Sequence, residues 1–282
     1  MKRLTALLRL ARISNLPTVW SNVLAASVLA GGMSAAAIAQ VMLAMSLLYT
    51  GGMFLNDAFD ERIDSRERPD RPLPSGVLSS QMVWVSGLGL LALGALLLAA
   101  FGHEAALAAV ALVVAILLYD AWHKGNPIAP FVMGLCRALV YVGTLVCAAA
   151  PLTLPLIGAS AALLAYVAGL TFAARQESFD RVGSWWPLAL LMAPVPWALV
   201  IFGTDWPTMA MAALLIAAVI TAIAWLQRRE AGDVKRAVSL LIAAIALIDA
   251  TFAASAGDTA IAIICCALFA LTLLLQRFVP GT

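Results

Sequence analysis

Long apolar stretches recur along almost the whole of this 282-residue chain, and they constrain its fold more than any other feature. About 63% of the residues are hydrophobic and only 11% are charged. A bilayer favours helices that satisfy their own backbone hydrogen bonds, and a spanning helix needs roughly 20 apolar residues. We therefore predict an all-α multi-span membrane protein with spans at about 16–38, 41–57, 82–101, 105–120, 128–149, 154–174, 186–203, 207–227, 236–256 and 259–277.

The basic residues support this arrangement, because loops rich in Lys and Arg stay on the cytoplasmic side of a membrane. Sixteen of the seventeen Lys and Arg residues fall on one side of the predicted spans, and the exception is Arg137, in the middle of the fifth span. We predict one transmembrane domain over residues 1–282, with 259–277 as an extra C-terminal span, in a bacterial inner (cytoplasmic) membrane. The net charge of +2 gives no reason to expect a nucleic-acid partner, and the four cysteines lie in apolar runs without metal or disulfide spacing.

An acidic segment follows the second predicted span and reads N-D-A-F-D-E-R-I-D from residue 56 to residue 64. If the span continues as a helix past Leu55, Asp57, Asp60 and Asp64 occupy positions i, i+3 and i+7 and share one face. Carboxylates so placed repel each other, and a divalent cation relieves the repulsion. Mg²⁺ prefers oxygen ligands and is typically shared between carboxylates and substrate phosphates. The alternative is a solvated cytoplasmic turn of mixed charge.

Two further groups of side chains suit phosphate binding. Arg68 and Arg71 follow the acidic segment at once, and a guanidinium matches phosphate oxygens geometrically. The loop after the fourth predicted span reads Y-D-A-W-H-K, and its Lys124 can reach a phosphate as a point charge. A lysine that only sets membrane topology is an equal alternative, and His123 is more simply read as a solvated interfacial side chain.

A partial copy of the acidic segment occurs 120 residues later, after the sixth predicted span, as Q-E-S-F-D-R-V-G-S over 176–184. The Phe and the second acid are identical in the two copies, Glu177 matches Asp57, and Ser184 replaces the last acid. We read this as an internal repeat that places two acidic clusters on the same side of the membrane, where they can hold metal on both sides of one diphosphate. Chance similarity of a nine-residue window is the alternative.

These motifs together resemble the UbiA superfamily of intramembrane prenyltransferases. The first family motif matches N-D-x-x-D-x-x-x-D from Asn56, and R-P-L-P-S-G follows from Arg71. The second family motif is weakened by Ser184, and the Tyr and Lys that the family carries after span four match Tyr119 and Lys124. The opening R-I-S-N-L-P-T-V-W-S-N is similar to the branch often labelled EboC-like.

The resemblance implies a helical bundle of nine to ten transmembrane helices around a central cavity, with the active-site loops on the cytoplasmic side. It implies Mg²⁺-dependent transfer of a prenyl group from a polyprenyl diphosphate to a small acceptor, which is an aromatic, a quinone precursor or a hydroxylated molecule. The expected metal ligands are Asp57, Asp60, Asp64, Glu177 and Asp180, and these five together with Lys124 are the expected catalytic residues. The expected diphosphate-binding residues are Asn56, Arg68, Arg71, Tyr119, Lys124 and Gln176.

Two charges stand inside predicted spans, Arg137 and Asp249, and such residues are functional candidates because they are costly in hydrocarbon. Either they pair with each other, or Arg137 binds a charged group of the acceptor. Two rival functions stay open. One is a non-catalytic lipid-binding or scaffold member of the same fold, suggested by Ser184, and the other is a transporter, a class in which internal repeats also occur.

Overall fold

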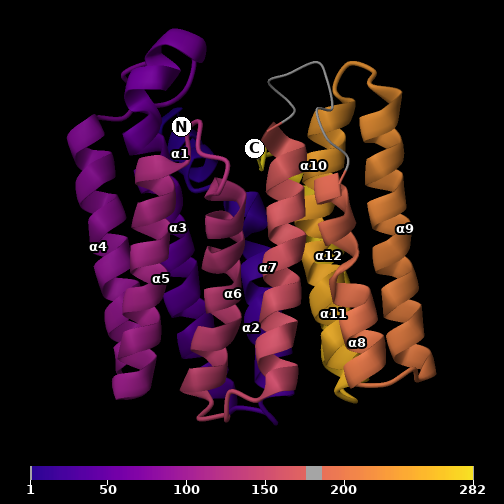
Figure 1. Cartoon of the computed structure of the whole chain (residues 1–282). Coiled ribbons are helices and arrows are strands. Elements are labelled where there is room, and N and C mark those ends of the chain that lie inside the picture. The colour runs from indigo at the N-terminus through magenta and orange to yellow at the C-terminus, as the bar shows by residue number, and fades with distance from the viewer. Residues whose placement is uncertain (1, 176–185, 282) are drawn as a thin grey trace.

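The computed structural model describes residues 2–175 and 186–281, and the chain there is helical with no strands. The helices run back and forth between two ends of one bundle (Figure 1). In chain order they are α1 Lys2–Leu10, η1 Ile13–Asn15, α2 Leu16–Leu29, α3 Ala35–Glu67, α4 Ser80–Ala99, α5 His103–Trp122, α6 Ala129–Cys147, α7 Leu154–Arg175, η3 Trp186–Met192, α8 Pro194–Ile201, α9 Trp206–Arg228, α10 Asp233–Ala243, α11 Ile245–Ser255 and α12 Thr259–Gln276.

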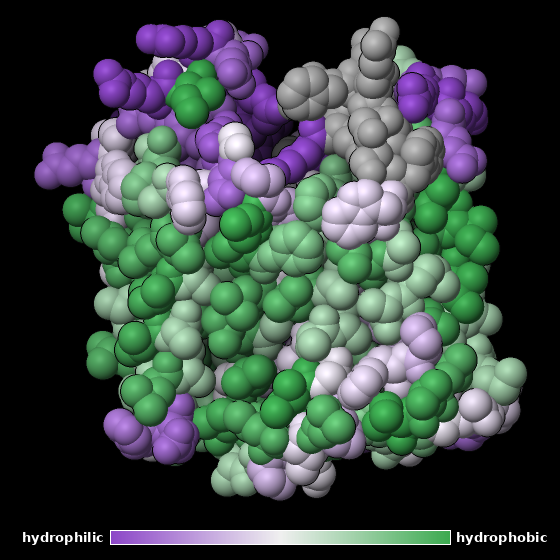
Figure 2. Space-filling model, in the orientation of Figure 1, coloured by the Kyte–Doolittle hydropathy of each residue, from purple (hydrophilic) through white to green (hydrophobic). Residues whose placement is uncertain are grey.

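Eight helical segments in the described part of the chain are long and apolar enough to cross a bilayer, which confirms the prediction of an all-α, multi-pass membrane protein. Two other predicted spans correspond to shorter elements, the 14-residue α2 and the pair η3 and α8. In Figure 2 a broad apolar band covers the middle of the visible face, and hydrophilic residues gather mainly along its upper edge.

Several predicted boundaries were wrong. The first span was predicted to reach residue 38, but α2 ends at Leu29, and Gly31 and Gly32 then turn the chain with φ of +90° and +102°, which glycine adopts without a Cβ clash. The span predicted at 236–256 is divided at Ala244 into α10 and α11. The span predicted at 186–203 begins as the 3₁₀ helix η3 before α8.

Helix α3 is the longest element, with 33 residues, and carries the first acidic motif. The Ser34 side chain caps its start by accepting a hydrogen bond from the Ala37 N–H. Its end coincides with Pro69, which disfavours helical geometry in the preceding residue, and Arg68 is accordingly non-helical. A helix of this length spans about 50 Å, whereas the hydrocarbon core of a bilayer is about 30 Å thick. The final turns therefore extend past the apolar layer, as expected for a span that continues beyond Leu55.

Helix α2 lies at the centre of the bundle, because its side chains enter two different hydrophobic clusters. Val19 and Val23 pack into the cluster formed with α3, α4, α5 and α6, while Ala25 and Ala26 pack into the cluster formed with α6, α7, α9 and α11. Helices α3 and α4 pack very closely, since a Cβ on Gly51 would lie 2.8 Å from a carbonyl oxygen of α4. Small residues allow such close packing between membrane helices.

Candidate functional site

The three carboxylates of the first motif lie on one face of the end of α3, as the helical spacing predicts. Asp57, Asp60 and Asp64 are 8%, 5% and 2% exposed, although this part of the helix extends beyond the apolar layer. The neighbouring residues Arg62 and Ser65 are exposed on the other side of the helix. The motif therefore faces the interior of the bundle and is not a solvated turn.

Two arginines contact the carboxylates at one end of this face. Arg71 Nη1 lies 2.6 Å from Asp64 Oδ2 and 3.7 Å from Asp57 Oδ1, so this side chain bridges two acids of the motif. Arg12 approaches from the turn between α1 and α2, with its Nη2 3.5 Å from Asp57 Oδ1. Arg12 itself has a left-handed backbone with φ of +43°, and its carbonyl oxygen accepts a hydrogen bond from the Tyr49 hydroxyl of α3 at 3.4 Å.

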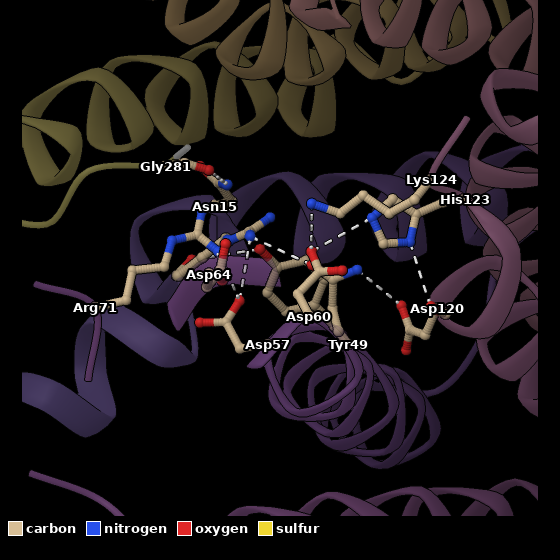
Figure 3. A network of polar contacts seen from close by, with 12 residues as sticks. Asn15, Tyr49, Asp57, Asp60, Asp64, Arg71, Asp120, His123, Lys124 and Gly281 are labelled. Atoms are coloured by element: carbon tan, nitrogen blue, oxygen red, sulfur yellow. Dashed lines mark hydrogen bonds and ion pairs between the residues drawn. The ribbon is translucent and has the colours of Figure 1, made fainter. Parts of the chain in front are cut away.

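The loop after α5 supplies the cationic and aromatic groups around Asp60, as Figure 3 shows. Lys124 Nζ lies 3.2 Å and His123 Nε2 3.4 Å from Asp60 Oδ2. The His123 ring stacks on Tyr119 at a centroid distance of 5.0 Å. Arg175, at the end of α7, holds this loop in place by donating to the backbone carbonyls of His123 and Asn126 at 2.9 and 2.7 Å.

The rim is the end of the bundle at which Asp57, Asp60 and Asp64 meet Arg12, Arg71 and Lys124. A polar pair extends the site below this rim. The Asn56 side-chain amide donates to Asp120 Oδ1 at 3.1 Å, and the Asn56 oxygen lies 3.5 Å from Arg12 Nη2. Asp120 is 4% exposed, and its Oδ2 has no hydrogen-bond partner within the described chain. Such a buried, half-satisfied carboxylate is costly in a folded protein unless it serves a ligand or ion.

Some predicted residues do not enter this network. Arg68, which the sequence grouped with Arg71, is exposed where α3 ends. The second motif lies outside the described residues, and this includes Gln176, Glu177, Asp180 and Ser184. Arg175, whose contacts hold the Lys124 loop, is the residue that directly precedes that motif in the sequence.

The oxygen-rich donor set suits Mg²⁺. Within residues 2–175 and 186–281 no three acidic, His or Cys side chains are close enough to ligate one ion. Mg²⁺ sites commonly use only one or two carboxylates, with water and substrate phosphate as the other ligands. Asp57 Oδ1 fits that description, because it is buried without a hydrogen-bond partner and has ionic contacts only at 3.5 and 3.7 Å. These residues therefore fit a Mg²⁺ ion whose coordination is completed by water and substrate phosphate.

A cavity of about 80 Å³ extends from this rim between α2, α3, α5 and α6. Tyr119 and Asp120 line its polar end, and Met45, Leu48 and Leu112 line its wall deeper in the bundle. Leu112 lies two turns of α5 below Asp120, so the cavity is about 12 Å deep along that helix. The cavity confirms the expected central space among the spans.

The two intramembrane charges do not form a direct ion pair. Asp249 is fully buried in α11 and accepts hydrogen bonds from Ser21 at 2.5 Å, from Tyr141 at 2.5 Å and from the Asn22 amide at 2.8 and 2.9 Å. Arg137 donates to the Asn22 amide oxygen at 2.9 Å. Pairing was one of two hypotheses, and the structure replaces it with an indirect link through Asn22.

Sequence reasoning missed three contributors to this site. Arg12 was read only as a topogenic charge, Asp120 was given no role, and His123 was read as solvated although its side chain is 15% exposed and faces Asp60. Asp120 directly follows Tyr119 in the Y-D-A-W-H-K stretch, and its place beside the predicted Tyr and Lys could have indicated that it belongs to the site. Arg12 gave no such signal, because its partner lies 45 positions away in the sequence.

Comparison with known proteins places these features in a family. The model of the UbiA prenyltransferase family matches residues 14–184, which is more than half of the chain. A digeranylgeranylglyceryl phosphate synthase of Ignicoccus hospitalis is 41% identical over 101 residues, covering 36% of this chain and 33% of that protein. The matched segments span about a third of the length of this and other curated relatives.

Solved structures match over much more of the chain, at low sequence identity. A UbiA homologue from Archaeoglobus fulgidus bound to DMAPP and Mg²⁺ superposes with a TM-score of 0.67 at 16% identity, covering 90% of this chain and 98% of the other. The apo structure of a UbiA homologue from Aeropyrum pernix K1 has a TM-score of 0.65 at 22% identity, covering 85% of this chain and 96% of the other. These likenesses establish a shared fold.

Proposed function

This chain belongs to the UbiA prenyltransferase family, and from that premise we propose that it transfers a prenyl group from an isoprenoid diphosphate to a small acceptor within the membrane. The observation that carries the proposal is the rim itself, where three buried carboxylates on one helix face three cationic side chains from three other segments. The relatives named above support it, since one is named as a synthase of a digeranylgeranylglyceryl phosphate and another binds DMAPP with Mg²⁺. The EboC-like assignment and the single-domain organisation stay predictions.

We assign the head group of the donor to the rim. Asp57, Asp60 and Asp64 would supply carboxylate ligands for Mg²⁺ there, one or two to an ion, with phosphate and water as the other ligands. Glu177 and Asp180 of the second motif would hold a second ion. Bound Mg²⁺ supplies Lewis-acid stabilisation of the negative charge that develops on the departing diphosphate.

The cations beside the motif are placed to bind the head group of the donor. Arg12, Arg71 and Lys124 each form an ion pair with a carboxylate of the motif. The same three side chains would donate charge-assisted hydrogen bonds to diphosphate oxygens. Asn56, Tyr119 and Gln176 complete the proposed diphosphate site, while Arg68, exposed at the end of α3, is the least well placed of the predicted set.

The reaction then requires three things from the chain. The C–O bond of the donor breaks, and its electron pair leaves with the diphosphate, which the rim cations stabilise. The remaining allylic cation is kept from water by the apolar walls of the cavity, which include Met45, Leu48 and Leu112. A nucleophilic carbon or oxygen of the acceptor forms the new bond to the prenyl carbon and loses one proton.

The orientation in the membrane follows from the charges. The rim lies at the end of the bundle that also carries the turns around 68–79, 123–128 and 229–232 (Figure 1), and these turns contain Arg68, Arg71, Lys124 and Arg229. We therefore propose that the site opens to the cytoplasm, in a bacterial inner membrane.

Purified protein in nanodiscs, incubated with Mg²⁺, allylic diphosphates of several lengths and a mixed acceptor panel, tests this function. Free diphosphate and prenylated product are measured together, the latter by mass spectrometry. We expect both to depend on Mg²⁺ and to disappear in Asp60→Asn. A transporter or a lipid-binding scaffold would release no diphosphate from any donor, and that result would refute the proposal.

A further inference from the structure

We propose that Asp120 is the base that takes up the proton of the acceptor during prenyl transfer. This inference rests on the proposed function and adds to it the fate of the proton that the acceptor loses when its new bond forms. Three features of the molecule support it: the free oxygen of the Asp120 carboxylate, its place in the cavity, and the ion pairs that occupy the carboxylates of the first motif.

One oxygen of the Asp120 side chain is held and the other is free. Oδ1 accepts a hydrogen bond from the Asn56 amide at 3.1 Å, whereas Oδ2 is buried and has no hydrogen-bond partner within the described chain. A carboxylate can accept about four hydrogen bonds, so this contact leaves most of its capacity unused. In a residue that is only 4% exposed, such an oxygen is costly unless it serves a ligand. Oδ2 is therefore available to the proton that a bound acceptor gives up.

Asp120 lies where the donor and the acceptor must meet. Asn56, whose amide holds Oδ1, directly precedes Asp57 of the first motif. His123 lies 3.3 Å from the Asp120 backbone oxygen through Nδ1 and 3.4 Å from Asp60 Oδ2 through Nε2 (Figure 3). Asp120 also lines the cavity, so it lies at the junction between the polar rim and the apolar interior. The donor carbon next to the diphosphate would lie at this junction.

The other cavity-lining side chains that carry an exchangeable proton are not bases at neutral pH. Phenols and thiols keep their proton there, and a guanidinium is permanently protonated. These side chains belong to Tyr49, Tyr119, Cys136 and Arg137. Of the side chains that line the cavity in the described chain, only that of Asp120 is a carboxylate.

The carboxylates of the first motif are already engaged. Asp64 pairs with Arg71 at 2.6 Å, and Asp60 pairs with Lys124 at 3.2 Å. These acids are also the proposed Mg²⁺ ligands, and a carboxylate that binds a cation takes up protons poorly. Asp120 forms no ion pair with the described residues, so no cationic side chain occupies it.

Transfer of this proton completes the bond changes of the reaction. The C–O bond of the donor breaks, and its electron pair leaves with the diphosphate. A lone pair of an acceptor hydroxyl, or a π pair of an aromatic ring, forms the bond to the prenyl carbon, and the proton moves from that oxygen or ring carbon to Asp120 Oδ2. Asp120 becomes a neutral acid and returns the proton to water once the products leave. In bulk water the solvent would accept the proton, but the apolar walls exclude solvent from the cavity.

Two small nucleophiles that compete for the prenyl cation test this role. Methanol must lose a proton when it forms the prenyl ether, whereas azide is an anion and has none to lose. Protein in nanodiscs turns over geranyl diphosphate with Mg²⁺ in the presence of both, and mass spectrometry gives the ratio of ether to azide product. This ratio does not depend on donor affinity or on the amount of folded protein. A general base contributes about 10²–10⁴-fold, so we expect Asp120→Asn to lower the ratio by about 100-fold or more.

Matched variants separate a base from a structural side chain. Asp120→Asn keeps an oxygen that can accept from the Asn56 amide, so a purely structural role predicts no change in the product ratio. Asp120→Glu keeps a carboxylate and should restore part of the ratio. The control Asp70→Asn changes an exposed acid and should give the wild-type ratio.

Cleavage of the donor is measured separately, by exchange of an oxygen isotope between the bridging and non-bridging positions of the diphosphate. This exchange should stay within about twofold in Asp120→Asn, because it requires no acceptor. A large fall in exchange would overturn the inference by assigning Asp120 to the donor, and loss of Mn²⁺ binding with a thiodiphosphate analogue would overturn it by making Asp120 a metal ligand. An unchanged product ratio in Asp120→Asn would also overturn it. A wild-type protein that neither exchanges the isotope nor releases diphosphate would refute prenyl transfer itself, and the inference with it.

Discussion

Replacing Asp249 with leucine removes a fully buried carboxylate that joins α11 to α2 and α6. Four hydrogen bonds from three donor groups end on this carboxylate, two from Asn22 and one each from Ser21 and Tyr141. Leucine has a similar size but accepts none of them. An unpaired buried donor costs about 1–3 kcal/mol, whereas single hydrogen bonds within membrane proteins average about 0.6 kcal/mol. For three donor groups we expect the free energy of unfolding to fall by about 2–5 kcal/mol.

Equilibrium unfolding in mixed detergent micelles, followed by far-UV circular dichroism and tryptophan fluorescence, measures this loss. Asp249→Asn keeps one acceptor oxygen, so its loss should be about half as large. The control is Asp70→Asn, an exposed acid in the turn after α3, which should change stability by less than about 0.5 kcal/mol. If Asp249→Leu proves as stable as this control, the network contributes little and the reasoning from its contacts is refuted.

Three further predictions concern the rim, the cavity and the packing. Arg71→Gln should raise the KM for the donor at least about 10-fold in an initial-rate assay, because the Arg71 guanidinium is proposed to contact diphosphate. In the control Arg68→Gln, which changes an exposed side chain, the KM for the donor should stay within about twofold. Equal effects of the two substitutions would refute the assignment. Met45→Trp narrows the cavity, so rates with long donors should fall more than rates with a five-carbon donor, and a uniform fall across donors would argue against a tail at this wall. Gly134→Ala places a Cβ 2.5 Å from a carbonyl oxygen of α7 and should lower the free energy of unfolding by about 1–3 kcal/mol in thermal or detergent unfolding. The Cβ of the control Gly89→Ala meets no neighbour within 4 Å, so this variant should not be destabilised. Similar stabilities of the two variants would contradict the close packing of α6 on α7.

Local periodicity made the first acidic motif predictable. Asp57, Asp60 and Asp64 share a face because of their spacing alone, and α3 does continue as a helix through all three. The all-helical, multi-span architecture followed from apolar length and from the one-sided distribution of basic residues, although eight of the ten predicted spans are long enough to cross a bilayer in the described chain. Neither argument requires knowledge of how distant helices pack.

Contacts between distant segments could not be predicted from periodicity or apolar length. The approach of Arg12 to Asp57 depends on the left-handed turn before η1, for which the sequence offers no glycine as a signal. The link from Arg137 to Asp249 depends on Asn22, an uncharged residue of the central helix α2 that drew no attention in the sequence. The two charges were recognised as unusual, but the residue that joins them was visible only in the fold.

The predicted helix boundaries were wrong for a different reason. Hydropathy averages over a window and is blind to a change of helix type or a short break within an apolar run. The division at Ala244 and the 3₁₀ geometry of η3 both lie inside continuous apolar stretches, so composition alone predicted single spans there.

The proposed reaction requires that carboxylates of α3 and a diphosphate share one divalent ion at the rim. Electron paramagnetic resonance of Mn²⁺, used in place of Mg²⁺, measures this directly with purified protein and an unreactive thiodiphosphate analogue of a short donor. We expect tight Mn²⁺ binding only when the analogue is present, and we expect it to be lost in Asp57→Asn but not in Asp70→Asn. Mn²⁺ binding that ignores the analogue, or that persists unchanged in Asp57→Asn, would contradict it.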